Sequence, residues 1–196
     1  RKIILKNMFV PVSKPLLGKE EEIRVNDAIH SGNISSFQGG YIKEFEEKFA
    51  EFVGVKHAIA VSSGTAALHL AVLALGIKEG DEIIVPTLTM MSSIFAPLYE
   101  RATPVPIDID EKTYNIDPNL IEEKITDKTR AIMVVHLYGH PVDMDPIMEI
   151  AKKHKLFVIE DAAEAHGAKY KGKMVGGIGD IGCFSMYANK LITTGE

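Results

Sequence analysis

Two residues able to do carbonyl or acid–base chemistry stand where apolar strands are expected to end. Lys190 follows the short apolar stretch 183–187, and Asp161 follows the apolar stretch 156–160. A partly desolvated lysine amine is a good nucleophile toward carbonyl carbons, although a lysine in this position can also be an ordinary loop residue. A carboxylate at the end of a core strand is costly unless it meets a cation, a metal ion or the N–H groups of a helix cap. We therefore expect carbonyl chemistry at Lys190, and at Asp161 either a cation partner, such as a protonated pyridine nitrogen, or a simple cap.

A third candidate site follows the predicted strand at residues 57–62, where the chain reads Ser63-Gly-Thr. Gly64 lets the backbone approach a ligand, and Thr65 begins a predicted helix whose first N–H groups and dipole suit an anion. Ser185, in the last predicted strand, could add a hydroxyl to the same site. The simpler alternative is that Ser63 or Thr65 only caps the helix. The sequence leaves open both a phosphate site and a cap.

The elements that must hold these residues alternate between strands and helices. Helices are predicted where apolar residues recur every three or four positions, and strands where short apolar runs are bounded by turns. The predicted helices are 18–31, 41–52, 65–75, 93–99, a segment after Asp117-Pro118 and 145–154; the predicted strands are 57–62, 82–86, 104–108, 131–136, 156–160 and 183–187. Such repeated units indicate an α/β fold with a mostly parallel central sheet and helices on both faces. Ligands of these sheets bind at the carboxyl ends of the strands, where all three candidate sites lie.

Composition narrows the class of protein. The 196 residues suffice for one α/β domain, which we place at residues 18–196 after an extended N-terminal arm at 1–17. The net charge of −5, with no long basic run, argues against nucleic acid or an anionic membrane as the partner. No stretch is long enough to span a membrane, and Cys183 is the only cysteine, so no internal disulfide can form. We expect a cytoplasmic protein.

Three stretches match or approach the residue pattern of a familiar motif, but their predicted structural context does not fit that motif. Residues 177–182 match the dinucleotide fingerprint, yet they precede a predicted strand instead of linking a strand to a helix. Residues 167–174 approach a phosphate-binding loop, but Met174 stands where Ser or Thr must hold magnesium. His136 and His140 could be zinc ligands, but Gly139 and the proline after His140 break any helix that would align them. We expect no metal.

Three segments, taken together and in this order, resemble a known family. They are Ser63-Gly-Thr-Ala-Ala67, Asp161-Ala-Ala-Glu-Ala-His-Gly-Ala168 and Phe184-Ser-Met-Tyr-Ala-Asn-Lys-Leu-Ile-Thr-Thr-Gly-Glu196. The chain resembles the fold-type I aminotransferases that use pyridoxal 5'-phosphate (PLP), and within them the DegT/DnrJ/EryC1/StrS family of sugar-nucleotide aminotransferases. The resemblance covers nearly the whole chain. It implies the large PLP-binding domain of that fold and transfer of an amino group from glutamate to a keto-sugar nucleotide, of the GDP or dTDP kind, for amino-sugar and polysaccharide biosynthesis.

The resemblance also implies a role for each candidate residue. Lys190 would bond to PLP and shuttle a proton between the substrate carbon and the cofactor, and Asp161 would keep the pyridine nitrogen protonated. The remaining positions would bind the cofactor: Gly64, Thr65 and Ser185 at its phosphate, Glu164 near its phenolic oxygen, and Ala163 against one face of its ring.

Two features depart from the pattern that the resemblance implies. Where the family usually places an aromatic side chain that stacks on the PLP ring, this chain has Met90, a thioether that can also pack on a π face. Chains of the family run for roughly as long again, through a further large-domain strand and a small C-terminal domain. We therefore expect the 196 residues to be an incomplete large domain from a homodimer with shared active sites, and a gap wide enough for one strand beside residues 183–187. The same loss should strip cover from residues 131–135 and 183–187.

Two alternatives stay open beside catalysis by transamination. One is a non-catalytic family member that binds PLP in a regulatory role; Met90 leaves room for it, whereas Lys190 and Asp161 favour catalysis. The other is dehydration, but dehydratases of the family carry histidine in place of the lysine, so Lys190 argues against it.

Overall fold

A five-stranded parallel sheet forms the centre of the molecule in this computed structural model, which describes residue 11, residues 14–35 and residues 40–195. The strand order is β2-β1-β3-β4-β7 within these residues. The strands are β1 (Glu82–Pro86), β2 (Thr103–Ile107), β3 (Thr129–Val135), β4 (Phe157–Asp161) and β7 (Ile181–Cys183), and every neighbouring pair is parallel. The predicted fold class is therefore confirmed.

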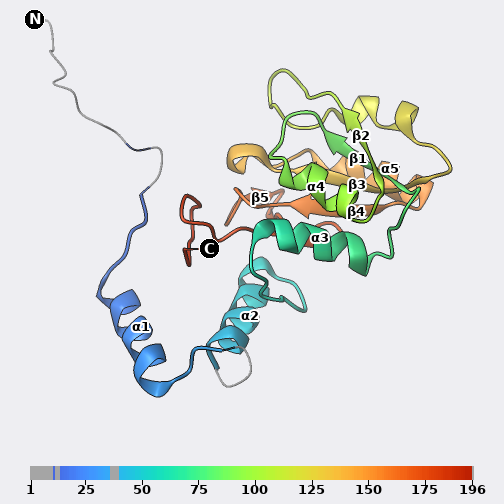
Figure 1. Cartoon of the computed structure of the whole chain (residues 1–196). Helices are drawn as coiled ribbons and strands as arrows, with labels where there is room; N and C mark the ends of the chain where they lie inside the picture. Colours follow the sequence, from blue (N-terminus) through green and yellow to red (C-terminus); the bar gives the residue numbers. More distant parts are fainter. Residues whose placement is uncertain (1–10, 12–13, 36–39, 196) are drawn as a thin grey trace, which may run out of the picture.

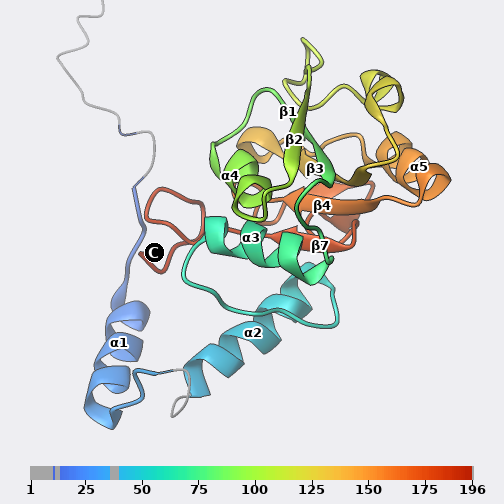
Figure 2. The same cartoon turned by 45° about the vertical axis from the view of Figure 1, so that its right-hand side comes forward.

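Helices cover both faces of this sheet (Figures 1 and 2). On one face lie α3 (Gly64–Ala74) and α4 (Ser92–Tyr99), and on the other lies α5 (Met144–His154). The helix predicted after Asp117-Pro118 is instead two short 3-10 turns, η1 (Pro118–Leu120) and η2 (Glu122–Lys124), and a third, η3 (Leu137–Gly139), follows β3. Asp117 caps η1 by accepting the Asn119 N–H, so the predicted start was right although no α-helix follows.

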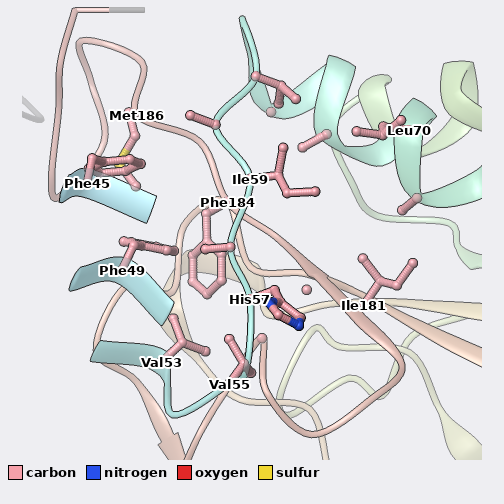
Figure 3. Close-up of a pocket in the computed structure, with 18 of the residues that line it drawn as sticks. Phe45, Phe49, Val53, Val55, His57, Ile59, Leu70, Ile181, Phe184 and Met186 are labelled. Atoms are coloured by element: carbon pink, nitrogen blue, oxygen red, sulfur yellow. The ribbon is translucent and has the colours of Figure 1, made fainter. Parts of the chain in front are cut away.

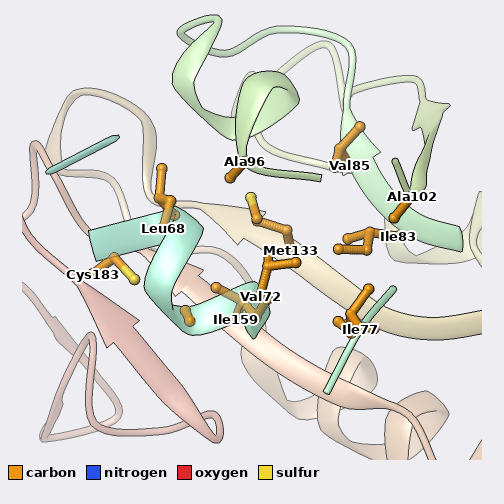
Figure 4. Packing of buried hydrophobic residues seen from close by; sticks show 12 residues of the cluster. Leu68, Val72, Ile77, Ile83, Val85, Ala96, Ala102, Met133, Ile159 and Cys183 are labelled. Atoms are coloured by element: carbon orange, nitrogen blue, oxygen red, sulfur yellow. The ribbon is translucent and has the colours of Figure 1, made fainter. Parts of the chain in front are cut away.

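Two apolar layers hold the helices to the sheet. Figure 4 shows the layer under α3 and α4, where Leu68 and Val72 pack against Met133 and Ile159. In the opposite layer, Ile147 of α5 belongs to a buried cluster that also contains side chains of β1, β2, β3 and β4. Burying one such side chain contributes about 1.5–3 kcal/mol, so the two layers dominate the stability of the fold. β3 is buried throughout its apolar run, so the prediction that residues 131–135 would lose their cover is wrong. In the stretch 183–187, Cys183 and Ser185 are buried and Tyr187 is exposed.

The first two helices lie beside this sheet domain. α1 (Lys19–Ser31) has no buried residue, and α2 (Gly40–Val53) buries only Ala50 and Val53. The ring of Phe49 in α2 packs edge-on against Phe184 after β7, with centroids 4.9 Å apart. Most of the predicted N-terminal arm lies outside the described residues, and residues 11 and 14–17 have no regular structure. No helix in the described part of the chain is both long and apolar enough to cross a bilayer.

Two predicted strands are corrected by the structure. Residues 57–62 form no strand, because no neighbouring strand lies close enough to pair with them. The last strand is residues 181–183 instead of 183–187: β4 ends at Asp161, which pairs with Cys183, so the following residues have no ladder to join. Burial raises the pKa of the Cys183 thiol to about 12, which leaves this cysteine a packing residue.

An apolar cavity of about 650 Å³ lies where the sequence predicts a gap for one strand. Residues 57–61 line one side, and the residues from Gly179 to Gly182 with Phe184 line the other (Figure 3). Side chains of α2, including Phe45 and Phe49, and of α3, including Leu70, complete the lining. The cavity therefore separates the extended segment 57–61 from the free edge of β7.

Candidate active site

Asp161 stands at the carboxyl end of β4, between β3 and β7, and is 4% exposed. The Ser93 hydroxyl donates to its Oδ2 at 2.7 Å, and the Ala163 N–H donates to its Oδ1 at 3.2 Å. Burial raises the pKa of the Asp161 carboxyl, while these two donors and the Lys190 ammonium oppose the rise. The predicted cap at Asp161 is thus present through Ala163, but the buried charge also favours a cationic partner.

Lys190 lies in the loop after β7, and its side chain meets Glu164, which follows the end of β4. Its side chain is 14% exposed, and its Nζ lies 3.2 Å from Glu164 Oε1. The other oxygen of Glu164 accepts the Tyr138 N–H at 3.0 Å, so the carboxylate bridges the lysine to the loop after β3. The lysine amine is therefore largely shielded from solvent and paired with a carboxylate at the strand end.

The structure brings the predicted phosphate-binding residues together at the start of α3. Ser63 caps the helix by accepting the Ala66 N–H at 3.1 Å, so the simpler prediction of a cap is right for Ser63. A Cβ built on Gly64 would lie 2.9 Å from the Cβ of Ser185, closer than real side chains approach, so glycine is required for this contact. The Thr65 hydroxyl is within 2.8 Å of Ser92 Oγ.

The two residues predicted to cover a cofactor ring stand at the same end of the sheet. Ala163 follows Asp161 by two residues and is half-buried. Met90 comes two residues before α4, and the residue is 66% exposed. Ser93 donates its backbone N–H to the Met90 carbonyl oxygen, which fixes the backbone here but not the thioether.

Glu160 is a buried charged residue that sequence reasoning did not single out. Its Oε2 accepts from His136 Nε2 at 3.0 Å and from the Gly176 N–H at 2.7 Å. Its Oε1 accepts from the N–H groups of Ile178 and Gly179 at 2.7 and 2.6 Å. Burial alone raises the pKa of this carboxyl, but the hydrogen bonds from His136, Gly179 and Gly176 outweigh burial and bring the pKa below its ordinary value. Two of these donors, Ile178 and Gly179, lie in the stretch 177–182 that imitates a dinucleotide fingerprint, and this stretch runs into β7 instead of linking a strand to a helix.

Hydrogen bonds also account for the two histidines that were considered as zinc ligands, His136 and His140. Val142 donates its N–H to His136 Nδ1 at 3.0 Å, so the ring proton sits on Nε2 and points at Glu160. At His140 the backbone carbonyl oxygen accepts from the side-chain amide of Asn115 at 3.0 Å. No group of three metal-ligating side chains occurs among the described residues. The second rejected motif, residues 167–174, forms the hairpin of β5 (Lys169–Tyr170) and β6 (Lys173–Met174).

Comparison with known proteins identifies the family of this chain. The DegT/DnrJ/EryC1/StrS aminotransferase family matches residues 15–196, and the chain belongs to this family. It is 58% identical over 189 residues to GDP-perosamine synthase of Escherichia coli O157:H7, covering 96% of this chain and 51% of the relative. The aminotransferase of Psychrobacter cryohalolentis has the same fold with a TM-score of 0.92 and 46% identity, over 96% of this chain and 47% of that one. A sugar aminotransferase of Streptococcus pneumoniae, solved in its PLP form, matches with a TM-score of 0.91 and 33% identity, over 95% of this chain and 51% of that one.

The chain spans about half the length of the curated relatives it matches.

Proposed function

We propose that this chain is the cofactor-binding part of a PLP-dependent aminotransferase that moves an amino group from glutamate to a keto-sugar nucleotide. The observation that supports this most directly is one strand-end site that combines the buried carboxylate of Asp161 with the Lys190–Glu164 pair. Similarity to GDP-perosamine synthase favours a GDP-4-keto-6-deoxy sugar over a dTDP sugar, and a role in polysaccharide biosynthesis such as that of an O-antigen.

The residues present fit PLP on physical grounds. Asp161 offers a buried anion that a protonated pyridine nitrogen would neutralise. The close approach of Gly64 to Ser185, beside the Thr65 hydroxyl, leaves backbone N–H groups and hydroxyls at a helix N-terminus, where a phosphate binds favourably. Glu164 lies on the Lys190 side of the site, as expected of a residue near the phenolic oxygen.

When bound, PLP supplies an electron sink for the carbanion at the substrate carbon. The chain's own residues supply the rest. Lys190 Nζ holds and returns the proton at that carbon, and Asp161 keeps the pyridine nitrogen protonated. Ala163 and Met90 would cover the two faces of the ring and exclude water from it.

The assay combines the whole protein, PLP and glutamate with a panel of GDP- and dTDP-keto sugars. We expect a visible absorption band from cofactor bound to the lysine, bleaching of that band by glutamate, and an amino-sugar nucleotide detected by mass. Lys190→Ala, prepared in parallel, is the control and should give neither band nor product. A protein that binds PLP but transfers no amino group to any acceptor would favour the regulatory alternative.

We also propose that the cavity beside β7 is filled by an extended segment that follows residue 196. The cavity is apolar, and it separates backbone at 57–61 from the free edge of β7, so a strand there would pair on both sides. Residues 1–196 expressed alone should aggregate or bind a hydrophobic dye, whereas the whole protein should not. A soluble, monomeric and active product of residues 1–196 would contradict this proposal.

The working molecule is proposed to be a cytoplasmic homodimer. Away from the cavity, α3 and α4 expose Leu73, Leu98 and Tyr99, which is unusual for a surface that faces only water. The single cysteine, buried and free, is consistent with a reducing compartment. Sedimentation of the whole protein at micromolar concentration tests the dimer, and a monomer would contradict it.

A further inference from the structure

The first two residues of α4 contact two different parts of the candidate site. Ser92 Oγ lies 2.8 Å from the Thr65 hydroxyl at the start of α3, and Ser93 Oγ lies 2.7 Å from Asp161 Oδ2. Ser93 is fully buried, and 68 residues of sequence separate it from Asp161. Nothing in the sequence pattern marks these serines, because both read as ordinary first-turn residues of an apolar helix.

The direction of the hydrogen bonds can be assigned from the acceptor. A carboxylate only accepts, so the Ser93 hydroxyl must donate to Asp161. Since its one proton is used there, the 2.7 Å contact between Thr89 Oγ1 and Ser93 Oγ must be donated by Thr89. The result is a directed chain from Thr89 through Ser93 to Asp161, and each bond strengthens the next.

This chain acts on a carboxylate that burial alone would neutralise. The charged or titratable groups that face Asp161 are the Lys190 ammonium, which favours its charge, the Glu164 carboxylate, which opposes it, and the Cys183 thiol on the neighbouring strand. The two donors to Asp161 reach different oxygens, Ser93 at Oδ2 and the Ala163 N–H at Oδ1. Together they fix the plane of the carboxylate as well as its charge.

We propose that Ser93, oriented by Thr89, is a positioning residue that keeps the Asp161 carboxylate ionised and fixed in orientation. The proposal deepens the proposed function, on which it rests for the identity of the cation that Asp161 meets. Ser93 itself does not touch that cation; it acts through Asp161. A merely structural hydroxyl would contribute the same stability at every pH, whereas a donor to an ionisable carboxylate contributes only when the carboxylate is charged.

The first experiment therefore needs no cofactor. Thermal midpoints of the whole protein without PLP are measured from pH 4 to pH 8 for wild type, Ser93→Ala and the matched control Ser92→Ala. Loss of the Ser93 donor should raise the proton affinity of Asp161 at least about tenfold, because hydrogen bonds to charged groups are the stronger kind. The deficit of Ser93→Ala should be smallest at acidic pH, where Asp161 is protonated, and should grow by a few degrees as the carboxylate ionises.

Ser92→Ala removes a neighbouring hydroxyl that contacts Thr65 and no titratable group, so its deficit should not change with pH. Thr89→Val removes only the upstream donor and should give a smaller pH-dependent deficit than Ser93→Ala. Ser93→Thr keeps the hydroxyl and should restore the wild-type pH profile. Equal, pH-independent losses in Ser93→Ala and Ser92→Ala would overturn the proposal.

The second experiment uses the protein loaded with PLP and follows the pH titration of its visible band. In Ser93→Ala a more basic Asp161 draws the proton away from the ring nitrogen, so the ring withdraws less charge and the midpoint of the titration should move to higher pH. An unchanged midpoint would contradict the proposal. A wild-type protein with no visible band would contradict the proposed function, while the first experiment would still test Ser93.

Discussion

Asp161→Asn separates the stability of the fold from the chemistry of the site. The side chain keeps its shape, and Asn Oδ1 can still accept from Ser93. The new NH2 group faces the Ala163 N–H, which loses its acceptor; an unmade hydrogen bond of this kind costs about 1–3 kcal/mol. Against this, the variant removes a buried charge whose desolvation raises the pKa of the wild-type carboxyl. The net change in unfolding free energy at neutral pH should be small, within about 1–2 kcal/mol.

The pH dependence of this difference has a defined sign. In the folded protein the pKa of Asp161 lies above its ordinary value of 3.8, so ionisation costs stability. That cost is absent below pH 3.8 and accumulates as the pH rises through the folded pKa. Without cofactor, Asp161→Asn should therefore gain stability relative to wild type as the pH is raised from about 4 toward neutrality. Denaturant titrations of both proteins at several pH values measure this difference in unfolding free energy.

Activity should respond in the opposite direction. Loss of a preorganised electrostatic partner in a buried site costs about 2.7–4 kcal/mol of transition-state stabilisation, or a 100- to 1,000-fold fall in turnover. Asp180→Asn is the matched control, because Asp180 accepts the Val158 N–H at 2.8 Å near the other end of the same strand. Turnover of Asp161→Asn within about threefold of wild type would show that Asp161 is only a cap and would refute the reasoning.

Three further changes test other parts of the site. Lys190→Ala should fold but lose both the visible cofactor band and amino transfer; turnover near the wild-type rate would remove Lys190 from the mechanism. Met90→Phe should tighten PLP binding by about 0.5–1.5 kcal/mol if this side chain covers the ring, as measured by the dissociation constant, and an unchanged constant would place another side chain there. Glu160→Ala should cost about 3–5 kcal/mol of unfolding free energy in denaturant, because it leaves buried N–H groups without an acceptor. Since the pKa of Glu160 is lowered, its contribution should be present above pH 4.5 and be lost as the pH falls through the folded pKa, so a loss independent of pH would contradict the assignment.

Local sequence pattern determined the elements of this protein and the place of its candidate residues along them. Buried runs such as Glu82–Pro86 specify strands because β-branched residues flanked by turn residues have few other ways to bury their surface. The order of the strand–helix units then requires a parallel sheet, so residues after the strands had to gather at one edge. Asp161 and Lys190 were found for this reason: each is a charged residue next to an apolar run.

Only the tertiary structure decided which side chains meet across that edge. Ser93 and Glu160 escaped notice because a serine in the first turn of a helix, or an acid beside another acid, has a satisfactory local explanation in the sequence. Their importance depends on partners far away in the chain, the 68 residues between Ser93 and Asp161 and the 24 between His136 and Glu160. The predicted strand at 57–62 failed for the same reason: a strand needs a hydrogen-bonded neighbour, and across the cavity beside β7 these residues have none. Periodicity is a property of the chain, whereas pairing depends on what the rest of the fold brings alongside.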